Sequence, residues 1–158
     1  MRGRSGRLSV ALAILAGVGL AYQTVWPADP GDDEIAQVLM PAEGDTPAVR
    51  QFKDTGKNPY NKEPDAIEQG FKLARAVACT HCHAGDLSGL IGPNLITGNW
   101  RYPKDGTDKG MFQTLYFGTG AGMAAWGKLG SLTSDEILKV MAFVRSKYRG
   151  DPKNITWE

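Results

Sequence analysis

Cysteine and histidine are scarce in this sequence, which has two of each in 158 residues, all between Cys79 and His83. A structural zinc site usually takes two pairs of ligands from well-separated positions. The crowding of all four residues into one turn therefore argues against such a site. No histidine remains elsewhere in the chain to act as a distant partner for this cluster.

The sequence also lacks a basic run, strand-like alternation of apolar residues and internal repeats. The missing basic run excludes nucleic acid as an expected partner. The missing alternation argues against a sheet and favours an all-α fold. A chain of this length suffices for one domain with a modest core.

Long apolar runs are absent except for residues 8–22, which follow Arg2, Arg4 and Arg7 without any acid. This pattern predicts a signal peptide over residues 1–21, cleaved after Ala21, and a periplasmic protein. An uncleaved membrane anchor is the alternative, although the run is short of the about 20 residues that span a bilayer.

Residues 22–63 are expected to form an acidic, proline-rich arm ahead of a domain over residues 64–158. Residues 22–65 hold nine acids and four bases, whereas residues 66–158 hold eight acids and eleven bases. Six of the nine prolines fall within residues 23–64, and this density forbids long helices. Apart from a turn or two over residues 32–40, the arm is predicted to be extended.

The domain is predicted to be all-α, with few helices and much loop. Apolar residues recur at helical spacing over residues 64–78, 108–118 and 133–149. Asp108 is the expected N-cap of the second helix, and Thr133 with Glu136 forms a capping box for the third. So few short helices make a thin core, which a bound group has to fill.

Cys79 and Cys82, followed by His83, form the Cys-x-x-Cys-His motif of c-type haem attachment. Each thiol can add to one vinyl group of a single porphyrin, while the histidine offers a nitrogen to the iron. A disulfide would leave His83 unexplained, and a thioredoxin-like pair expects a βαβ setting. His81 is read as a spacer.

A methionine is the candidate for the sixth iron ligand, since no histidine remains outside the motif. Met111 and Met141 occupy apolar positions of predicted helices, and Met40 lies in the arm. Met123 lies in the glycine-rich stretch "GTGAGMAAWG", which can bring its thioether to the iron or simply pack. A filled sixth position favours electron transfer without catalytic residues, whereas a labile one would allow peroxide or gas chemistry.

The sequence resembles the class I c-type cytochromes and, more closely, the cytochrome cL group, over roughly residues 52–150. The likeness rests on "TGKNPYNKEPDAI", "CTHCH", "IGPNL", "NWRYPK", "TDKGMF" and "GAGM". It implies three to four short helices around one covalently bound haem c. It also implies a monomer that carries electrons from a PQQ-dependent methanol or alcohol dehydrogenase to a downstream cytochrome c or oxidase.

The resemblance also assigns roles to single residues. It implies covalent haem attachment at Cys79 and Cys82, and iron ligation by His83 and Met123. The Pro93 carbonyl would accept a hydrogen bond from the outer nitrogen of His83, and Gly70 would lie where two helices cross. Four further residues would pack near the haem, or simply in the core: Trp100, Arg101, Tyr102 and Trp126.

Two other roles within the carrier class remain open at this point. A general cytochrome c shuttle that feeds a terminal oxidase would carry the same motif and the same loop methionine. So would a haem subunit of another dehydrogenase. The motif alone specifies a cytochrome c and does not separate these roles.

Overall fold

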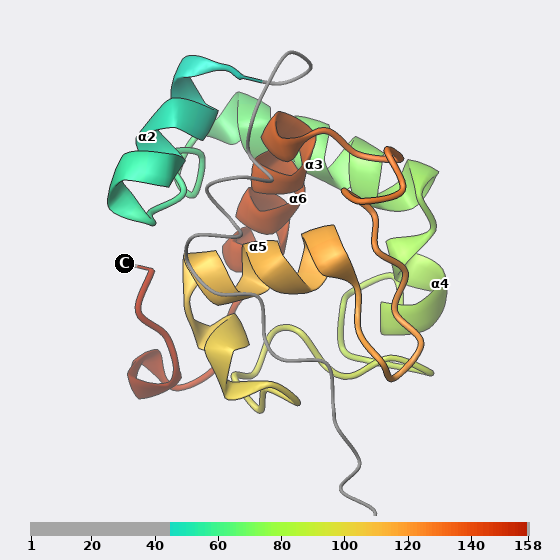
Figure 1. Cartoon of the computed structure of the whole chain (residues 1–158). Helices are drawn as coiled ribbons and strands as arrows, with labels where there is room; N and C mark the ends of the chain where they lie inside the picture. Colours follow the sequence, from blue (N-terminus) through green and yellow to red (C-terminus); the bar gives the residue numbers. More distant parts are fainter. Residues whose placement is uncertain (1–44, 158) are drawn as a thin grey trace, which may run out of the picture.

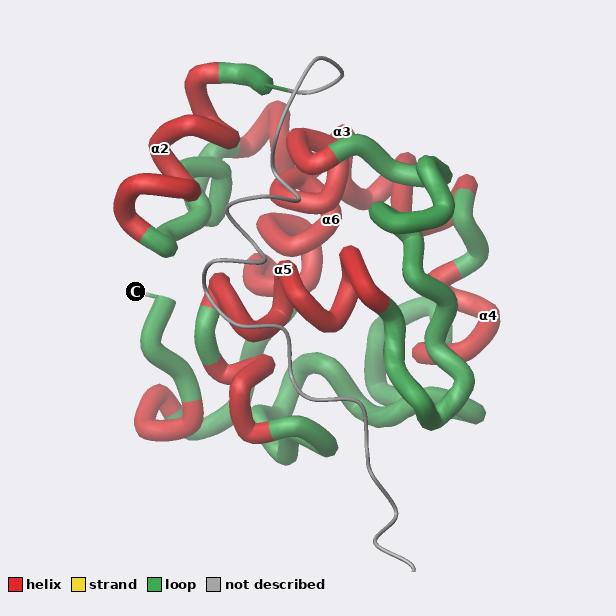
Figure 2. The backbone as a smooth tube through the Cα atoms, in the orientation of Figure 1, coloured by secondary structure: helices red, strands yellow, loops and turns green. Residues whose placement is uncertain are grey.

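A computed structural model describes residues 45–157 and contains helices and loops, with no strand among those residues (Figure 2). The all-α prediction is therefore confirmed. The expected signal peptide and the turn over residues 32–40 lie outside the described residues. In chain order the elements are α2 (Pro47–Thr55), α3 (Pro64–Ala76), α4 (Cys79–His83), η1 (Pro103–Gly106), α5 (Asp108–Phe117), α6 (Ser134–Ser146) and η2 (Pro152–Asn154).

The crossing of α3 and α6 is the centre of the fold (Figure 1). A Cβ atom added to Gly70 would lie 2.0 Å from the carbonyl oxygen of Lys139 and 3.1 Å from Cβ of Phe143. Only glycine allows the two backbones to approach this closely. The rings of Phe71 and Phe143 pack beside the crossing, with centroids 5.3 Å apart. The predicted crossing at Gly70 is confirmed.

Helix α6 begins at the predicted capping box. The backbone N–H of Thr133 donates to Oε2 of Glu136 at 2.8 Å, and the N–H of Glu136 donates to Oγ1 of Thr133 at 3.3 Å. These two bonds satisfy donors that a helix start leaves unpaired. The helix then buries Ile137, Val140 and Met141 in the core.

Helix α5 covers the predicted residues, but Asp108 does not cap it. Oγ1 of Thr107 accepts the N–H of Gly110 at 2.9 Å, so Thr107 is the N-cap. The carboxylate of Asp108 is buried and accepts hydrogen bonds from Arg145 and from the backbone N–H of Asn58. Asp108 pairs with the buried guanidinium of Arg145 instead, and Thr107 caps the helix.

The prediction of an extended arm over residues 22–63 is wrong for residues 47–55, which form α2. Val49 and Phe52 are 1% and 2% exposed, and the Phe52 ring packs on Phe112 with centroids 5.0 Å apart. A proline suits the first turn of a helix, where its missing N–H is not needed, and Pro47 takes that place. The folded unit therefore begins before the expected boundary at residue 64.

Within residues 45–157 no helix is long and apolar enough to cross a membrane. Helix α2 and the C-terminal end of the chain lie on one side of the molecule, and α4 lies on the other (Figure 1). Helix α5 runs between them, so the loop that follows it emerges on the α4 side. The short helix with both cysteines and the loop with Met123 thus share one side of the fold.

Candidate functional site

Helix α4 is a single turn that carries both cysteines and His83. It lies between two alanines with positive φ, Ala78 at 61° and Ala84 at 66°. Such angles are uncommon for residues with a Cβ, and here they turn the chain sharply before and after α4. The sequence motif is thereby presented as one compact unit.

The two cysteines of α4 form no disulfide and differ in exposure. Cys82 is exposed, whereas Cys79 is partly buried against the core. Burial raises the pKa of the Cys79 thiol to about 11. Residues three positions apart on a helical turn lie on the same face, so both cysteines can reach one bound group although only Cys79 packs against the core.

The imidazole of His83 is buried, with 7% of the residue exposed, and its orientation is fixed. Nδ1 lies 2.8 Å from the carbonyl oxygen of Pro93. A carbonyl can only accept, so Nδ1 carries the hydrogen and Nε2 keeps its lone pair. Nε2 is thus the ring nitrogen available to a metal, and the hydrogen bond at Nδ1 makes it a more basic ligand.

Gly92 packs directly on the face of His83. A Cβ atom at this position would lie 2.7 Å from Cε1 and 2.9 Å from Nδ1 of the ring. The N–H of Gly92 also donates to the carbonyl of Cys82 at 2.8 Å. Glycine therefore lets the loop lie close enough for Pro93 to reach the ring.

The loop from residue 84 to residue 95 is closed by backbone hydrogen bonds. The N–H of Gly89 donates to the carbonyl of His83 at 2.9 Å, and the N–H of Leu95 donates to the carbonyl of Leu87 at 3.0 Å. Leu87 anchors the loop in the core at 1% exposure. The tip projects outwards, with Leu90 and Ile91 at 73% and 86% exposure.

Met123 and Trp126 lie together on the loop that follows α5, and both are partly buried against the core. The N–H of Trp126 donates to the carbonyl of Leu115 at 3.1 Å, and the N–H of Lys128 donates to that of Tyr116 at 3.0 Å. These bonds satisfy carbonyls that the end of α5 would otherwise leave unpaired. The loop is thus closed at its base on α5.

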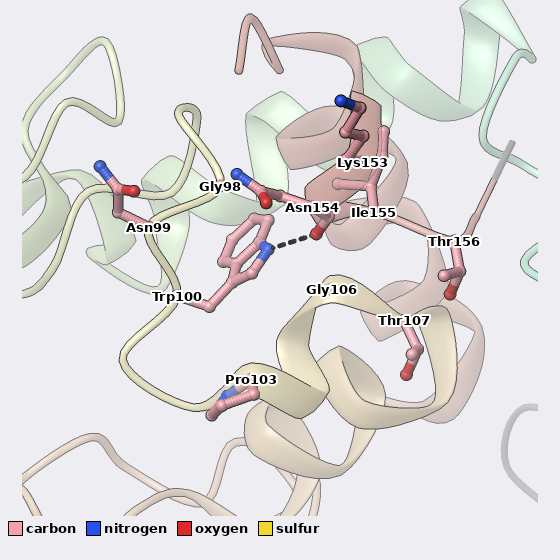
Figure 3. A pocket seen from close by; sticks show the side chains of 10 residues that line it. All are labelled: Gly98, Asn99, Trp100, Pro103, Gly106, Thr107, Lys153, Asn154, Ile155 and Thr156. Atoms are coloured by element: carbon pink, nitrogen blue, oxygen red, sulfur yellow. Dashed lines mark hydrogen bonds between the residues drawn. The ribbon is translucent and has the colours of Figure 1, made fainter. Parts of the chain in front are cut away.

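Trp100 packs against the C-terminal segment (Figure 3). Its Nε1 donates to the carbonyl of Asn154 at 2.9 Å, and its ring stacks on Tyr148 with centroids 6.2 Å apart. Arg101 is exposed, and Tyr102 is partly buried just before η1. These contacts favour the interpretation that Trp100 packs against the protein core and not near the haem.

A cleft of about 500 Å³ opens beside Trp100 (Figure 3), and a second of about 400 Å³ adjoins the end of α2. Thr107 and Thr156 line both clefts. None of the cysteines of α4, His83 or Met123 lines either one. The two clefts therefore form no part of the candidate site around α4.

The donor set around α4 fits a c-type haem. Cys79 and Cys82 lie three positions apart on one turn, and the imidazole of His83 follows them directly. Its Nδ1 is hydrogen-bonded to Pro93, so Nε2 is left for a metal. A thioether, Met123, lies on a loop on the same side of the molecule. No group of three or more His, Cys, Asp or Glu that could hold a separate metal ion occurs in the described part.

Sequence reasoning missed two residues that shape this site. Gly92 precedes the proline of "IGPNL", and Thr119 lies four residues before Met123. A glycine beside a proline signals a tight backbone approach and could have indicated the first. The role of Thr119 depends on the path of its loop, which no local pattern encodes.

Comparison with known proteins places the chain in a family. The family described as cytochrome c oxidase, cbb3-type, subunit III matches residues 65–144. Cytochrome c-L of Methylorubrum extorquens is 35% identical over 113 residues, which are 72% of this chain and 56% of that protein. The chain therefore spans little more than half the length of this curated relative.

Solved structures give the same result. Cytochrome cL of Methylophaga aminisulfidivorans matches with a TM-score of 0.70 and 38% identity, over 77% of this chain and 79% of that one. Cytochrome cL of Hyphomicrobium denitrificans matches with a TM-score of 0.68 and 35% identity, over 77% and 71%. Together with the motif on α4, these matches show that the chain belongs to the class I c-type cytochromes, electron carriers with covalently bound haem c, and that it resembles cytochrome cL.

Proposed function

We propose that this cytochrome is a periplasmic mono-haem carrier for a PQQ-dependent methanol or other alcohol dehydrogenase. It takes single electrons from the dehydrogenase and passes them to a downstream cytochrome c or oxidase of the respiratory chain. The relatives named cytochrome cL support this role. The signal peptide expected over residues 1–21 supports export to the periplasm, where the chain acts as a monomer.

The observation that carries the proposal is the fixed ring of His83. Its Nδ1 is engaged by Pro93 at 2.8 Å, which leaves Nε2 as the nitrogen for a haem iron. Cys79 and Cys82 on the same turn attach the porphyrin through two thioether bonds. Haem held in this way supplies a one-electron couple.

Met123 is the proposed second axial ligand. The loop that follows α5 and carries Met123 lies on the α4 side of the fold, and Met123 is partly buried against the core, whereas Met111 and Met141 are buried within helices at 5% and 0% exposure. A thioether ligand favours ferrous iron and raises the reduction potential. With His83 and Met123 both bound to the iron, no open position would remain there for a substrate, so the protein would carry electrons without catalysing a reaction.

The exposed tip at Leu90 and Ile91 is the proposed centre of the docking surface. It lies next to Pro93 in the chain, and it offers a partner apolar area that is otherwise in contact with water. Residues 22–44 contain five acids and no base, and we propose that they steer the encounter with the dehydrogenase. Such steering weakens with salt, because exposed charges are screened over about 8–10 Å.

The test compares electron donors to the oxidised holoprotein by stopped-flow absorbance. We expect purified PQQ-dependent methanol dehydrogenase with methanol to reduce it at least about tenfold faster than a quinol-oxidising complex does. The rate should fall as salt is raised, and deletion of residues 22–44 should reduce that salt dependence.

A second candidate is a general shuttle or an oxidase-linked haem subunit, which the description of the matched family favours. Rapid reduction by the quinol-oxidising complex, with none by the alcohol dehydrogenase, would replace our proposal with this one. Reduction by both donors at similar rates would also exclude a dedicated dehydrogenase partner.

A further inference from the structure

Thr119 bonds both polar backbone groups of Met123, its N–H and its carbonyl oxygen. The N–H of Thr119 donates to the carbonyl oxygen of Met123 at 3.0 Å. Its side-chain Oγ1 accepts the N–H of Met123 at 3.4 Å. Its own carbonyl accepts the N–H of Gly122 at 3.2 Å. One residue thus engages both polar backbone groups of the methionine.

Gly118 makes this arrangement sterically possible. Its φ of +69° lies in the left-handed region, which glycine adopts without strain. A Cβ atom at this position would lie 2.5 Å from the carbonyl oxygen of Met123 and 2.7 Å from the backbone nitrogen of Ala125. The chain before Thr119 is therefore pressed against the segment that carries the methionine.

The loop around Met123 is thus closed twice. The bond from Trp126 to Leu115 closes it at its base, and the bonds of Thr119 close it again around the methionine. Opening the inner closure breaks the hydroxyl bond of Thr119, while the outer closure stays intact. A shift of the Met123 backbone that carries its thioether away would break these inner bonds.

We infer that Thr119 is a positioning residue for the distal ligand and that its hydroxyl sets how readily an outside ligand displaces Met123. This inference rests on the proposed ligation by Met123. In the closed loop the hydroxyl satisfies the N–H of a partly buried residue. Without the hydroxyl, the closed loop loses stability and the open loop does not, so ligand exchange becomes easier.

The experiment titrates the oxidised holoprotein with imidazole and follows the near-red absorption band of methionine-bound ferric haem. Thr119→Val removes the hydroxyl at nearly constant shape, and Thr119→Ser restores it. We expect Thr119→Val to bind imidazole about two- to tenfold more tightly than the natural protein, the equivalent of one hydrogen bond. Thr119→Ser should lie within about twofold of the natural protein.

A purely structural role gives a different pattern. Thr119→Val would then lower the denaturant midpoint of unfolding while its imidazole affinity matched that of Thr119→Ser, and this result would overturn the inference. Two further variants separate it from the proposed ligation. Met123→Ala should lose the near-red band, and Met111→Ala should keep it. A band that survives in Met123→Ala would reject the ligation itself.

Discussion

The two sides of this molecule are held together by different kinds of interaction. On the side of α2 and the C terminus, charged and hydroxyl side chains bond across long sequence distances. The guanidinium of Arg145 bonds Asp108 at 3.3 Å and the carbonyl oxygens of Asp105 and Thr107 at 3.1 and 2.8 Å. On the α4 side, backbone bonds and residues with positive φ shape the loops that carry His83 and Met123.

This difference separates stability from ligand geometry. Long-range side-chain bonds join α2, α5, α6 and the C-terminal segment, so their loss should weaken the whole fold. Backbone bonds on the α4 side join residues of one loop or of the helix end next to it, so their loss should move a ligand and leave the fold largely intact. Substitutions on the two sides should therefore change different measurements.

The largest effect on stability is expected at Arg145. Only 1% of its side chain is exposed, and the guanidinium lies 3.4 Å from the centroid of the Trp157 ring. Burial lowers the pKa of Arg145 to about 10, although the negative charge of Asp108 acts in the opposite direction and raises it. Arg145→Met should cost about 3–5 kcal/mol of unfolding free energy, because Asp108 is left buried without its cation.

Chemical denaturation followed by circular dichroism measures this loss. Lys72→Met is the control, since it breaks the exposed ion pair of Lys72 with Glu68 and should change the unfolding midpoint very little. The near-red band of the haem should be the same in both variants. A band that shifts in Arg145→Met would show that the two sides of the molecule are not separable.

The fold could be predicted from sequence where the signal is local. The capping box of Thr133 and the apolar spacing after it located α6, and the spacing after Pro64 located α3. Helix α2 was missed because the proline density of its region outweighed two signals, Pro47 in its first turn and Gly56 just past its end. The assignment of Asp108 as a cap failed because its partner Arg145 lies 37 residues away.

The candidate site shows the same division between local and distant information. Cys-x-x-Cys-His is contained in five residues, so the sequence alone indicates haem. The contact of Gly92 with the His83 ring and the bonds from Thr119 to Met123 depend on how loops return. A single sequence contains no pattern that reports such a path.

The second prediction concerns Asp135, which joins α6 to the N-terminal part of the fold. Its carboxylate accepts bonds from Thr46 at 2.6 Å and Tyr60 at 2.9 Å, and pairs with Lys139 at 2.8 Å. Burial alone would raise the pKa of Asp135, but these three bonds outweigh it and hold the pKa below its usual value. The folded state therefore binds this proton less readily than the unfolded state does.

Stability from Asp135 should thus be present above about pH 4, the pKa of an unfolded aspartate, and should be lost as the pH falls through the lower folded pKa. Asp135→Asn should cost about 1–2 kcal/mol of unfolding free energy at neutral pH. It should also make the unfolding free energy depend less on pH in the acid range. Denaturation midpoints measured from pH 6 to pH 3 test this, with Asp65→Asn at an exposed site as the control. If the denaturation midpoints of Asp135→Asn and of the natural protein fall equally between pH 6 and pH 3, this prediction is contradicted.

The smallest effect on stability, and the sharpest test of the comparison, is expected at Gly92. In Gly92→Ala the new Cβ would lie 2.7 Å from the His83 ring, so the ring or the loop has to shift and the bond to Pro93 is strained or lost. Loss of that bond makes the imidazole a weaker donor. The reduction potential should then rise by about 20–60 mV, the one-electron equivalent of a hydrogen bond, while unfolding free energy changes by less than about 1 kcal/mol.

Gly85→Ala is the matched control, because a Cβ at that position meets nothing within 4 Å, and it should leave both quantities unchanged. If Gly92→Ala instead lowers stability as much as Arg145→Met and leaves the potential unaltered, the loop around His83 belongs to the scaffold and the division between the two sides fails.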